Sequence, residues 1–540
     1  MTRRLHPALG ALAAAALCAC TLEPRLPHAA PDVTPAAFPS GGMGYMPGYG
    51  DGFATAATPW ERFFVDPKLR KVIALALREN RDLRVAALDI VEARAQYRVQ
   101  RADLLPTVDA SAGFTTGRES SYGVSGTPTG TGTTGTGTGA TGTGTAGTGT
   151  GTTGTGTTGV GTTGFSSGLS GAYRIYDAQL GFSDYELDVF GRVRSLTKEA
   201  FEQYLATTEG RRSTQISIVA EVATDWLTYA ADLQRLQTER ATLKAEQASL
   251  DITQNRFKYG IASLLDVQQA QTAVETAQSN IQTYLTQAAQ DQNALNLVVG
   301  QAVPVELLPG PLGGALVTQP EAPAGLDSRV LLARPDVRQA EHQLRAYNAD
   351  IGAARAAFFP TIALTGSGGS TSLYLNKLFT AGTGTYSFGP SVSLPIFDFG
   401  RNRANLAYSK AQRDAALATY EKSIQSAFTD VANALAQRAN VDELIASQER
   451  LVQATSGSLQ LSTARYERGV DTYLNVLTAQ LNLASAQQTL ISARLTRASN
   501  LVSLYRALGG GLGEEEVGRP AARDPIAPSA DTSPRARKRG

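Results

Sequence analysis

The segment RFKYGIASLLDVQQAQ, residues 256–271, is followed 209 residues later by RYERGVDTYLNVLTAQ, residues 465–480. The two segments share an arginine, a glycine and the pattern leucine, valine, alanine, glutamine in one register. The same offset also relates Gly191 to Gly400 and Gly300 to Gly509. Because chance does not hold one register over about a hundred residues, the sequence predicts two copies of one structural unit.

Upstream of these segments the register changes. The run Leu104-Leu105-Pro106-Thr107-Val108 matches Phe358-Phe359-Pro360-Thr361-Ile362 at an offset of 254 residues. The first copy is therefore 45 residues longer, and residues 126–164, almost wholly Thr and Gly, account for nearly all of the excess. Such a composition cannot bury a core, so the tract is predicted to be a disordered insertion in one connection.

The two copies define the expected organisation of the chain. The first repeat is predicted at residues 60–310 and the second at residues 326–511, followed by a disordered tail at 512–540. Each copy is expected to begin with a helix, over 66–102 in the first and 327–357 in the second.

A very long helix is expected in the middle of each copy. Residues 192–254 and 401–463 lack proline. A glycine turn then leads into a second helix of about 37 residues, which ends near Gly300 or Gly509. We expect the first and last helices of a copy to lie end to end beside the long one.

Between the first helix and the long helix of each copy, the pattern changes to a period of two. In the second copy Tyr386, Phe388 and Val392 alternate with small polar residues such as Ser387 and Ser391. This pattern is typical of a strand with lipid on one face and water on the other, although a half-buried soluble sheet gives the same alternation. Two copies supply four strands, which cannot close a barrel, so membrane strands require an oligomer.

The N-terminus has the features of an export signal. Arg3 and Arg4 precede the apolar run 8–17, and residues 1–19 are interpreted as a signal peptide. The end of this run, Leu17-Cys18-Ala19-Cys20, is similar to a bacterial lipobox, which predicts lipidation of Cys20 and a lipid-tethered segment at 20–59. Thr21 follows where an aspartate usually retains a lipoprotein in the inner membrane, so the outer membrane is favoured.

Composition and motifs exclude several other classes. The net charge of +1 offers no global attraction to nucleic acid. The three histidines lie far apart in sequence, no catalytic constellation is found, and neither an enzyme activity nor a cofactor is expected. Of these histidines, His342 is expected on the surface of a helix.

Four runs carry a resemblance to a known family: Trp60-Glu61-Arg62-Phe63-Phe64-Val65-Asp66-Pro67, Tyr185-Glu186-Leu187-Asp188-Val189-Phe190-Gly191-Arg192, Ala353-Ala354-Arg355-Ala356-Ala357-Phe358-Phe359-Pro360 and Leu394-Pro395-Ile396-Phe397-Asp398-Phe399-Gly400-Arg401. Together they resemble the TolC-type outer-membrane efflux family, and most closely its lipoprotein branch, the outer-membrane factors of RND multidrug pumps. The resemblance covers roughly residues 20–511, apart from the Thr/Gly tract.

The resemblance implies a mainly α fold with membrane β: a trimer that combines a twelve-stranded β-barrel with a periplasmic α-helical barrel. It implies a passive exit duct for drugs, with a periplasmic adaptor and an inner-membrane pump as partners. A protein-secretion duct of the type I kind and a surface structural lipoprotein remain alternative interpretations.

Site residues are carried over from the resemblance by position. Adaptor-docking tips are expected at Tyr259, Gly260 and Ile261 and at Arg468, Gly469 and Val470. A periplasmic gate is expected just beyond them, with the candidates Asp266, Tyr466, Asp471, Asn475 and Thr478. Since Asn475 and Thr478 stand where relatives often carry aspartate, acidic control of the gate is expected to rest mainly on Asp266.

Overall fold

The computed structural model describes residues 22–27, 33–39, 45, 59–118, 172–313 and 328–511. Cys20, the Thr/Gly tract at 126–164 and the tail at 512–540, each the subject of a prediction, lie outside these residues. The chain divides into two compact units. One is helical, and the other is a sheet built from residues 105–187 and 361–393.

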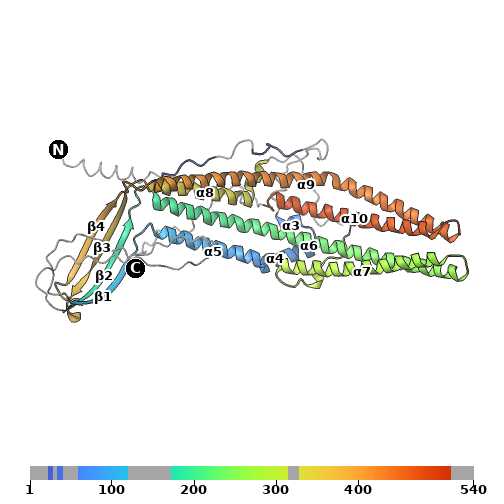
Figure 1. Cartoon of the computed structure of the whole chain (residues 1–540), viewed down its shortest axis with the longest axis horizontal. Helices are drawn as coiled ribbons and strands as arrows, with labels where there is room; N and C mark the ends of the chain where they lie inside the picture. Colours follow the sequence, from blue (N-terminus) through green and yellow to red (C-terminus); the bar gives the residue numbers. More distant parts are fainter. Residues whose placement is uncertain are drawn as a thin grey trace, which may run out of the picture. The chain divides into compact units, whose positions relative to one another are not determined.

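The helices of the first repeat are α3 (Trp60–Phe63), α4 (Pro67–Glu79), α5 (Arg81–Ala102), α6 (Arg192–Lys258) and α7 (Leu264–Val299) (Figure 1). Those of the second repeat are α8 (Pro335–Ala356), α9 (Arg401–Glu467) and α10 (Tyr473–Ala507). The long helices α6 and α9 have 67 residues each, which confirms the duplicated long-helix unit. Short 3-10 turns follow α7 at Val305–Leu307 and precede α8 at Ser328–Ala333.

The predicted single helix over 66–102 is wrong, because the chain breaks between α4 and α5. Asn80 has an extended backbone there, with a ψ of 134°, and its side chain caps α5 by accepting from the Leu83 amide at 2.8 Å. The helix predicted over 327–357 is likewise divided, at Arg334, because Pro335 occupies the first position of α8.

Both long helices begin at a glycine with a positive φ, 78° at Gly191 and 88° at Gly400. A nearby aspartate accepts hydrogen bonds from the first free amides: Asp188 from Val193 and Arg194, and Asp398 from Gly400 and Asn402. The glycine makes the sharp entry into the helix possible, and the carboxylate satisfies its free amides.

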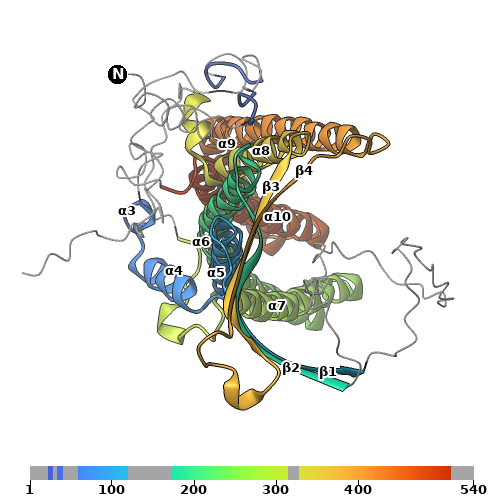
Figure 2. The ribbon, with the colours of Figure 1, turned by 90° about the vertical axis from the view of Figure 1, so that its left-hand side faces the viewer.

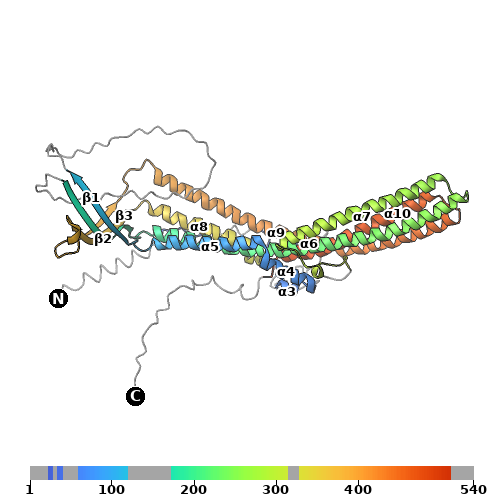
Figure 3. The same ribbon diagram turned by 90° about the horizontal axis from the view of Figure 1, so that it is seen from below.

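Within each repeat the shorter helices pack along the long one, as the sequence predicts. Helices α5 and α7 both pack on α6, and α8 and α10 both pack on α9. Across the repeats, α6 also contacts α8 and α10. Figure 3 shows the two hairpins, α6 with α7 and α9 with α10, running side by side to their turns.

The larger core of the helical unit joins the two repeats. It gathers apolar residues of α4, α6, α7 and α10 around Phe63, Phe64 and Tyr505. The ring of Phe63 stacks on Tyr505 with 4.5 Å between centroids. A second core, between α8, α9 and α10, takes in Phe38 of the N-terminal segment, whose ring stacks on Phe428 at 4.8 Å.

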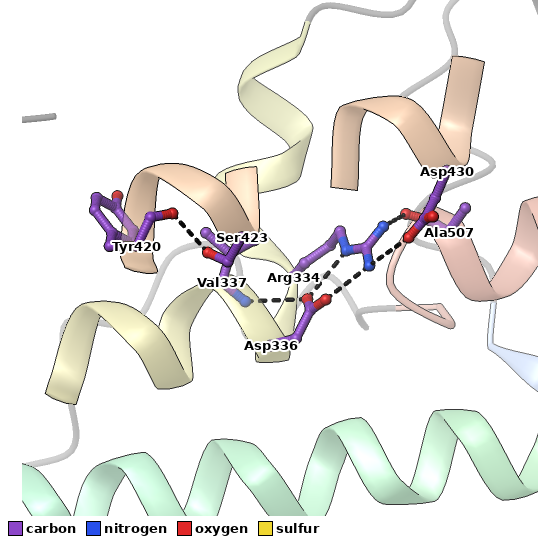
Figure 4. Close-up of polar contacts among 7 residues, drawn as sticks. All are labelled: Arg334, Asp336, Val337, Tyr420, Ser423, Asp430 and Ala507. Atoms are coloured by element: carbon purple, nitrogen blue, oxygen red, sulfur yellow. Dashed lines mark hydrogen bonds and ion pairs between the residues drawn. The ribbon is translucent and has the colours of Figure 1, made fainter. Parts of the chain in front are cut away.

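Arg334 connects three helices at the junction before α8 (Figure 4). Its guanidinium donates to both carboxylate oxygens of Asp336, at 3.0 and 2.7 Å, and to the carbonyl of Ala507 at 2.6 Å. It also lies 3.5 Å from the carboxylate of Asp430 on α9. The Arg334 side chain is only 9% exposed, and its charge is balanced by the carboxylates of Asp336 and Asp430, which are 41% and 53% exposed.

His342 does not lie on a helix surface. It is 8% exposed, and its Nδ1 lies 2.7 Å from Oε2 of Glu202 on α6. The prediction failed because it considered α8 alone, whereas the packing of α6 against α8 encloses this side chain.

The sheet unit contains four antiparallel strands in the order β1 (Asp109–Arg118), β2 (Ala172–Glu186), β3 (Thr361–Ser372) and β4 (Gly384–Ser393) (Figure 2). Strands of the two repeats therefore pair directly, β2 with β3. A bulge between Phe182 and Tyr185 bends β2, with Asp184 at a φ of 52°.

The two faces of the sheet differ in chemistry, as the alternation predicts. Ladder partners share a face, and one face carries Phe114, Tyr176, Leu180, Tyr386, Phe388 and Val392. The opposite face carries Ser111, Asp177, Gln179, Ser367, Ser387 and Ser391. On the apolar face Tyr386 is 91% and Phe388 67% exposed, so this chain alone leaves large aromatic side chains without cover.

Among the described residues, no helix combines the length and the apolar character that crossing a bilayer requires.

Candidate functional site

The two hairpin turns have the same backbone geometry. At the end of α6 the amides of Gly260 and Ile261 donate back to the carbonyls of Phe257 and Arg256, at 2.9 and 2.8 Å. At the end of α9 the amides of Gly469 and Val470 repeat this pattern 209 residues later, at 2.9 and 3.0 Å. Both glycines have a φ of 72°, which side chains disfavour, so these turns need glycine.

The predicted tip residues lie on the surface of these turns. Tyr259 is 82% exposed, Ile261 64% and Val470 62%, and Arg468 is exposed beside them. Such a set of uncovered apolar side chains at the end of a hairpin is typical of a contact surface rather than of a free turn.

Of the predicted gate residues, Asp266 has a structural role as well. Its Oδ2 accepts from the amide and from the hydroxyl of Ser263, at 2.8 Å each, and its own amide donates to Ser263 Oγ at 3.2 Å. The two residues thus form a capping box at the start of α7. The capping box therefore holds the Asp266 carboxylate in place at the first turn of α7.

In the second repeat the acidic group lies four residues earlier. Asp471 accepts from the Thr472 amide at 3.0 Å, from Arg465 Nε at 3.2 Å and from the side-chain amide of Asn475. The Asn475 hydrogen bond is the largest cause that holds the pKa of Asp471 below its usual range. Asn475, the equivalent of Asp266, therefore supports a neighbouring carboxylate instead of supplying one.

Arg256 joins the two hairpins near their ends, and sequence reasoning missed it. Its Nη1 donates to the carbonyl of Glu467 at 2.7 Å, and its guanidinium carbon lies 4.7 Å from the ring centroid of Tyr466. The carbonyl belongs to the last residue of α9, so the cation lies where the helix dipole favours it. Arg256 belongs to the repeated segment that the sequence shows. The sequence does not show that its side chain contacts the other hairpin.

Tyr466 is the one gate candidate that is buried. Its ring packs edge-on against Tyr473, 5.4 Å between centroids, and its hydroxyl has no partner. Tyr473 is fully buried and its hydroxyl is 3.4 Å from Ser249 on α6. Burial, the largest cause, raises the pKa of Tyr473. The structure thus brings Tyr466 together with Arg256, and Asp471 with Asn475.

Thr478 does not join these contacts. It is exposed, and its hydroxyl donates to the Leu474 carbonyl one turn back at 2.8 Å.

A column of acidic side chains follows α6 toward this end, and it too was missed. Asp225, Asp232, Glu239 and Glu246 recur every seven residues, so they share one side of the helix. Asp232, Glu239 and Glu246 are 2–4% exposed. The heptad spacing was visible in the sequence, but only the packing shows that this side faces α7 and α10.

Amide groups and one cation contact these acids. Gln488 on α10 donates to Glu239 at 3.0 Å, and Gln480 hydrogen-bonds Glu246. Asp232 pairs with Arg235, and its carboxyl also acts on that of Asp291 on α7, whose pKa it raises. One carboxylate oxygen of Glu246 and one of Asp291 are buried without a partner.

Burial makes these carboxyls hard to ionise. Desolvation is the main cause that raises the pKa of Glu246 to about 7, and it acts together with Asp232 to raise the pKa of Asp291 to about 6. Desolvation and then the Glu221 charge raise the pKa of Asp225 to about 6. We therefore expect the interface between α6 and its neighbours to respond to pH.

No group of three or more potential metal-ligating side chains is found in the part of the chain that the structure describes.

The duplicated hairpins, the glycine tips and the two-faced sheet define a class of protein, one whose strands suit a membrane and whose long helices extend into water. The sequence model described as "Outer membrane efflux protein" matches residues 72–301 and 326–510. The chain belongs to this family of outer membrane efflux proteins, which confirms the resemblance found in the sequence.

Relatives and solved structures agree with this assignment. The antibiotic efflux pump outer membrane protein ArpC of Pseudomonas putida is 42% identical over 92% of this chain and 93% of its own length. The outer membrane protein OprJ of Pseudomonas aeruginosa is 37% identical over 86% of this chain and 88% of its own. The open-state MtrE outer membrane channel of Neisseria gonorrhoeae has a TM-score of 0.74 and 33% identity, and the match covers 92% of this chain and 99% of MtrE.

Proposed function

We propose that this protein is the outer-membrane exit duct of a tripartite efflux pump and passively conducts antibiotics and related small molecules. The two-faced sheet is the observation that carries the proposal. Its apolar face exposes Tyr386, Phe388 and Val392, and its opposite face is mostly polar, with serine, threonine, glutamine and aspartate side chains. The apolar side chains of the first face suit contact with lipid, and the polar side chains of the second face suit contact with water.

The sheet also supports a trimer. Strands β1 and β4 are the edges of the described sheet, and open edges are not tolerated in lipid. Four strands are too few for a barrel, whereas three copies supply twelve and leave no edge. In this arrangement the helices of three copies form the periplasmic tunnel.

Lipidation of Cys20 fits the path of the N-terminal segment. Leu22, two residues further on, accepts a hydrogen bond on its carbonyl from Arg355 at 2.9 Å. Glu23 pairs with Lys198 at 2.6 Å and accepts from Asn348 at 3.0 Å. The chain therefore leaves its proposed anchor close to the end of α8 that leads into β3.

The remaining proposals concern the turns at the ends of α6 and α9. The exposed side chains of Tyr259, Ile261 and Val470 are a docking surface for a periplasmic adaptor, which connects the duct to an inner-membrane pump. The contacts of Tyr466 and Asp471 hold the mouth closed, and Asp266 supplies the acidic group of the first repeat.

Two experiments test the proposed duct, and a third tests the proposed lipid anchor. A deletion strain should become sensitive to antibiotics, dyes and detergents, and purified protein should form channels in a planar bilayer. Unchanged sensitivity with loss of a secreted protein would favour the type I secretion alternative. Unchanged sensitivity, unchanged secretion and no conductance would favour a structural lipoprotein. Replacement of Cys20 by Ala should abolish palmitate labelling, and persistent labelling would refute the anchor.

A further inference from the structure

A surface pocket lies at one end of the sheet unit, between the start of β2 and the connection from β3 to β4. Its volume is about 480 Å³, and it is open to solvent. The side chains that line it are Arg174, Tyr176, Leu373, Tyr374, Leu375 and Asn376. An arginine and an amide set among aromatic and aliphatic groups can bind a ligand that is polar at one end and apolar at the other.

The pocket lies on the apolar face. Tyr176 is the ladder partner of Phe114, and their rings are 4.9 Å apart. Arg174 stands two residues before Tyr176 on the same strand and therefore on the same face. Leu180, 57% exposed, continues this face along β2 away from the pocket. Arg174 thus places a charge at the end of a face whose large side chains are aromatic or aliphatic.

Chain connectivity identifies which end of the sheet this is. The residues that lead to or from helices, 103–108, 187–191, 357–360 and 394–400, all attach at the opposite end of the strands. The pocket is therefore at the end remote from the helix connections. In the proposed function this end faces the outside of the cell, so the inference rests on that proposal.

Among the described residues that line or flank the pocket on this face, the charged side chains are positive. The ammonium of Lys377 lies 5.5 Å from the ring centroid of Tyr374, one of the lining residues. None of the lining residues is acidic, and the connection 373–383 contains no acidic residue. On the nearby part of β2 the acidic Asp177 belongs to the opposite face, where it lies against Gly113.

The wall of the pocket is held in place by hydrogen bonds within the sheet unit. Ser370 donates to the hydroxyl of Thr383 at 2.7 Å, and the Thr371 amide donates to the Thr383 carbonyl at 2.9 Å. Thr383 in turn donates to the carbonyl of Leu378, whose side chain is 7% exposed. This closure at the base of the connection fixes the segment that carries Tyr374, which lines the pocket with Arg174, and Lys377, whose ammonium lies over the Tyr374 ring.

From these observations we propose that the pocket binds the phosphate-bearing headgroup of an anionic lipid in the outer leaflet. Arg174 and Lys377 pair with the phosphate, and Asn376 hydrogen-bonds the polar headgroup. The acyl chains lie along Tyr176, Phe114 and Leu180, where they cover exposed apolar surface.

The test uses the full-length protein in vesicles of phosphatidylcholine that contain diphosphorylated lipid A as the probe. Retained probe is counted by native mass spectrometry for wild type, for Arg174→Gln and for Lys377→Gln. Each variant should bind the probe about tenfold more weakly, because each loses one charge-assisted contact. Lys410→Gln, which removes an exposed charge on α9, is the matched control and should bind like wild type.

Several results would overturn the proposal: equal affinity in all variants, an equal loss in Lys410→Gln, equal binding of dephosphorylated lipid A, or displacement of the probe by millimolar inorganic phosphate. Conductance of the same preparations in planar bilayers separates this inference from the proposed function. Channels that conduct normally but do not select the phosphorylated lipid would refute the pocket alone. Absence of conductance in wild type would refute the duct.

Discussion

Asn80 and Arg334 occupy equivalent positions of the two repeats, 254 residues apart, and both donate a hydrogen bond to the end of the last helix of their own repeat. Asn80 Nδ2 donates to the carbonyl of Val298 and Arg334 Nη1 to that of Ala507, each at 2.6 Å. These carbonyls are themselves equivalent, 209 residues apart. Two different side chains thus cap the equivalent helix end: Asn80 does so with a neutral amide, and Arg334 with the buried charge that Figure 4 shows.

Replacement of these caps should destabilise the helical unit to different degrees. Asn80→Ala removes the partners of the Leu83 amide and the Val298 carbonyl and should cost about 1–2 kcal/mol. Arg334→Met also leaves Asp336 without its cation and should cost about 2–4 kcal/mol. Chemical unfolding followed by circular dichroism measures both. Gln96→Ala on the exposed face of α5 is the control, and a loss there as large as in Asn80→Ala would contradict the assignment.

Replacement of Gly260 and of Gly457 by alanine should change the stability of the protein in opposite directions. At Gly260 a methyl group meets nothing within 4 Å, but the φ of 72° penalises it, so Gly260→Ala should destabilise the turn by about 1 kcal/mol. At Gly457, inside α9, a methyl group also meets nothing, and Gly457→Ala should stabilise by about 0.5–1 kcal/mol. Hydrogen exchange at the tip and in α9 measures the two effects. The same sign in both variants would refute the backbone explanation.

Loss of Arg256 should loosen the contact between the hairpins. In Arg256→Gln the Tyr466 ring loses its cation and the Glu467 carbonyl a charged donor, which together contribute about 1–3 kcal/mol. If these contacts hold the mouth closed, single channels in planar bilayers should open more often than wild type. Lys258→Gln removes a charge from the same turn of α6 and should leave the opening frequency unchanged. An Arg256→Gln channel that gates like wild type would exclude this contact from the gate.

The packing of α6 on α7 and α10 should weaken as the pH rises. The folded-state pKa values of Glu246, about 7, and Asp291, about 6, lie above their ordinary values. Their contribution to stability is therefore fully present below about pH 4, where both states are protonated, and is lost as the pH rises through 6 and 7. The free energy of opening in α6 and α7, obtained from hydrogen exchange after correction for the intrinsic exchange rate at each pH, should be smaller at pH 8 than at pH 5.

Neutral substitutes test the origin of this pH dependence. Glu246→Gln and Asp291→Asn remove the carboxyls that resist ionisation and should reduce the difference between pH 5 and pH 8. Arg235, Gln287, Gln480 and Gln488 remain in place as the charged and polar groups that face the column. Glu275→Gln alters an exposed acid of α7 and should keep the full pH difference. If neither Glu246→Gln nor Asp291→Asn changes the difference in stability between pH 5 and pH 8, other groups cause that difference.

The sequence predicted the elements that depend on local pattern. The glycine turns at 260 and 469 and the two-faced strands are visible in neighbouring residues, and the structure has them where they were expected. The break at Asn80 was missed because its neighbours continue a helical pattern, although Pro335 marks the same break in the other repeat. The tip, gate and lipid-anchor roles stay proposals.

From the sequence alone follow the duplication, the alternation of helical and strand segments in each copy and the chemistry of the two sheet faces, because repeat register, turn glycines and alternation can be read along the chain. The tertiary structure alone decided which groups are buried and paired. His342 lies against Glu202, Arg256 reaches Tyr466, and Asp232 meets Asp291 only because separate helices pack there. Contact across helices depends on which faces pack together, and that is a property of the whole fold.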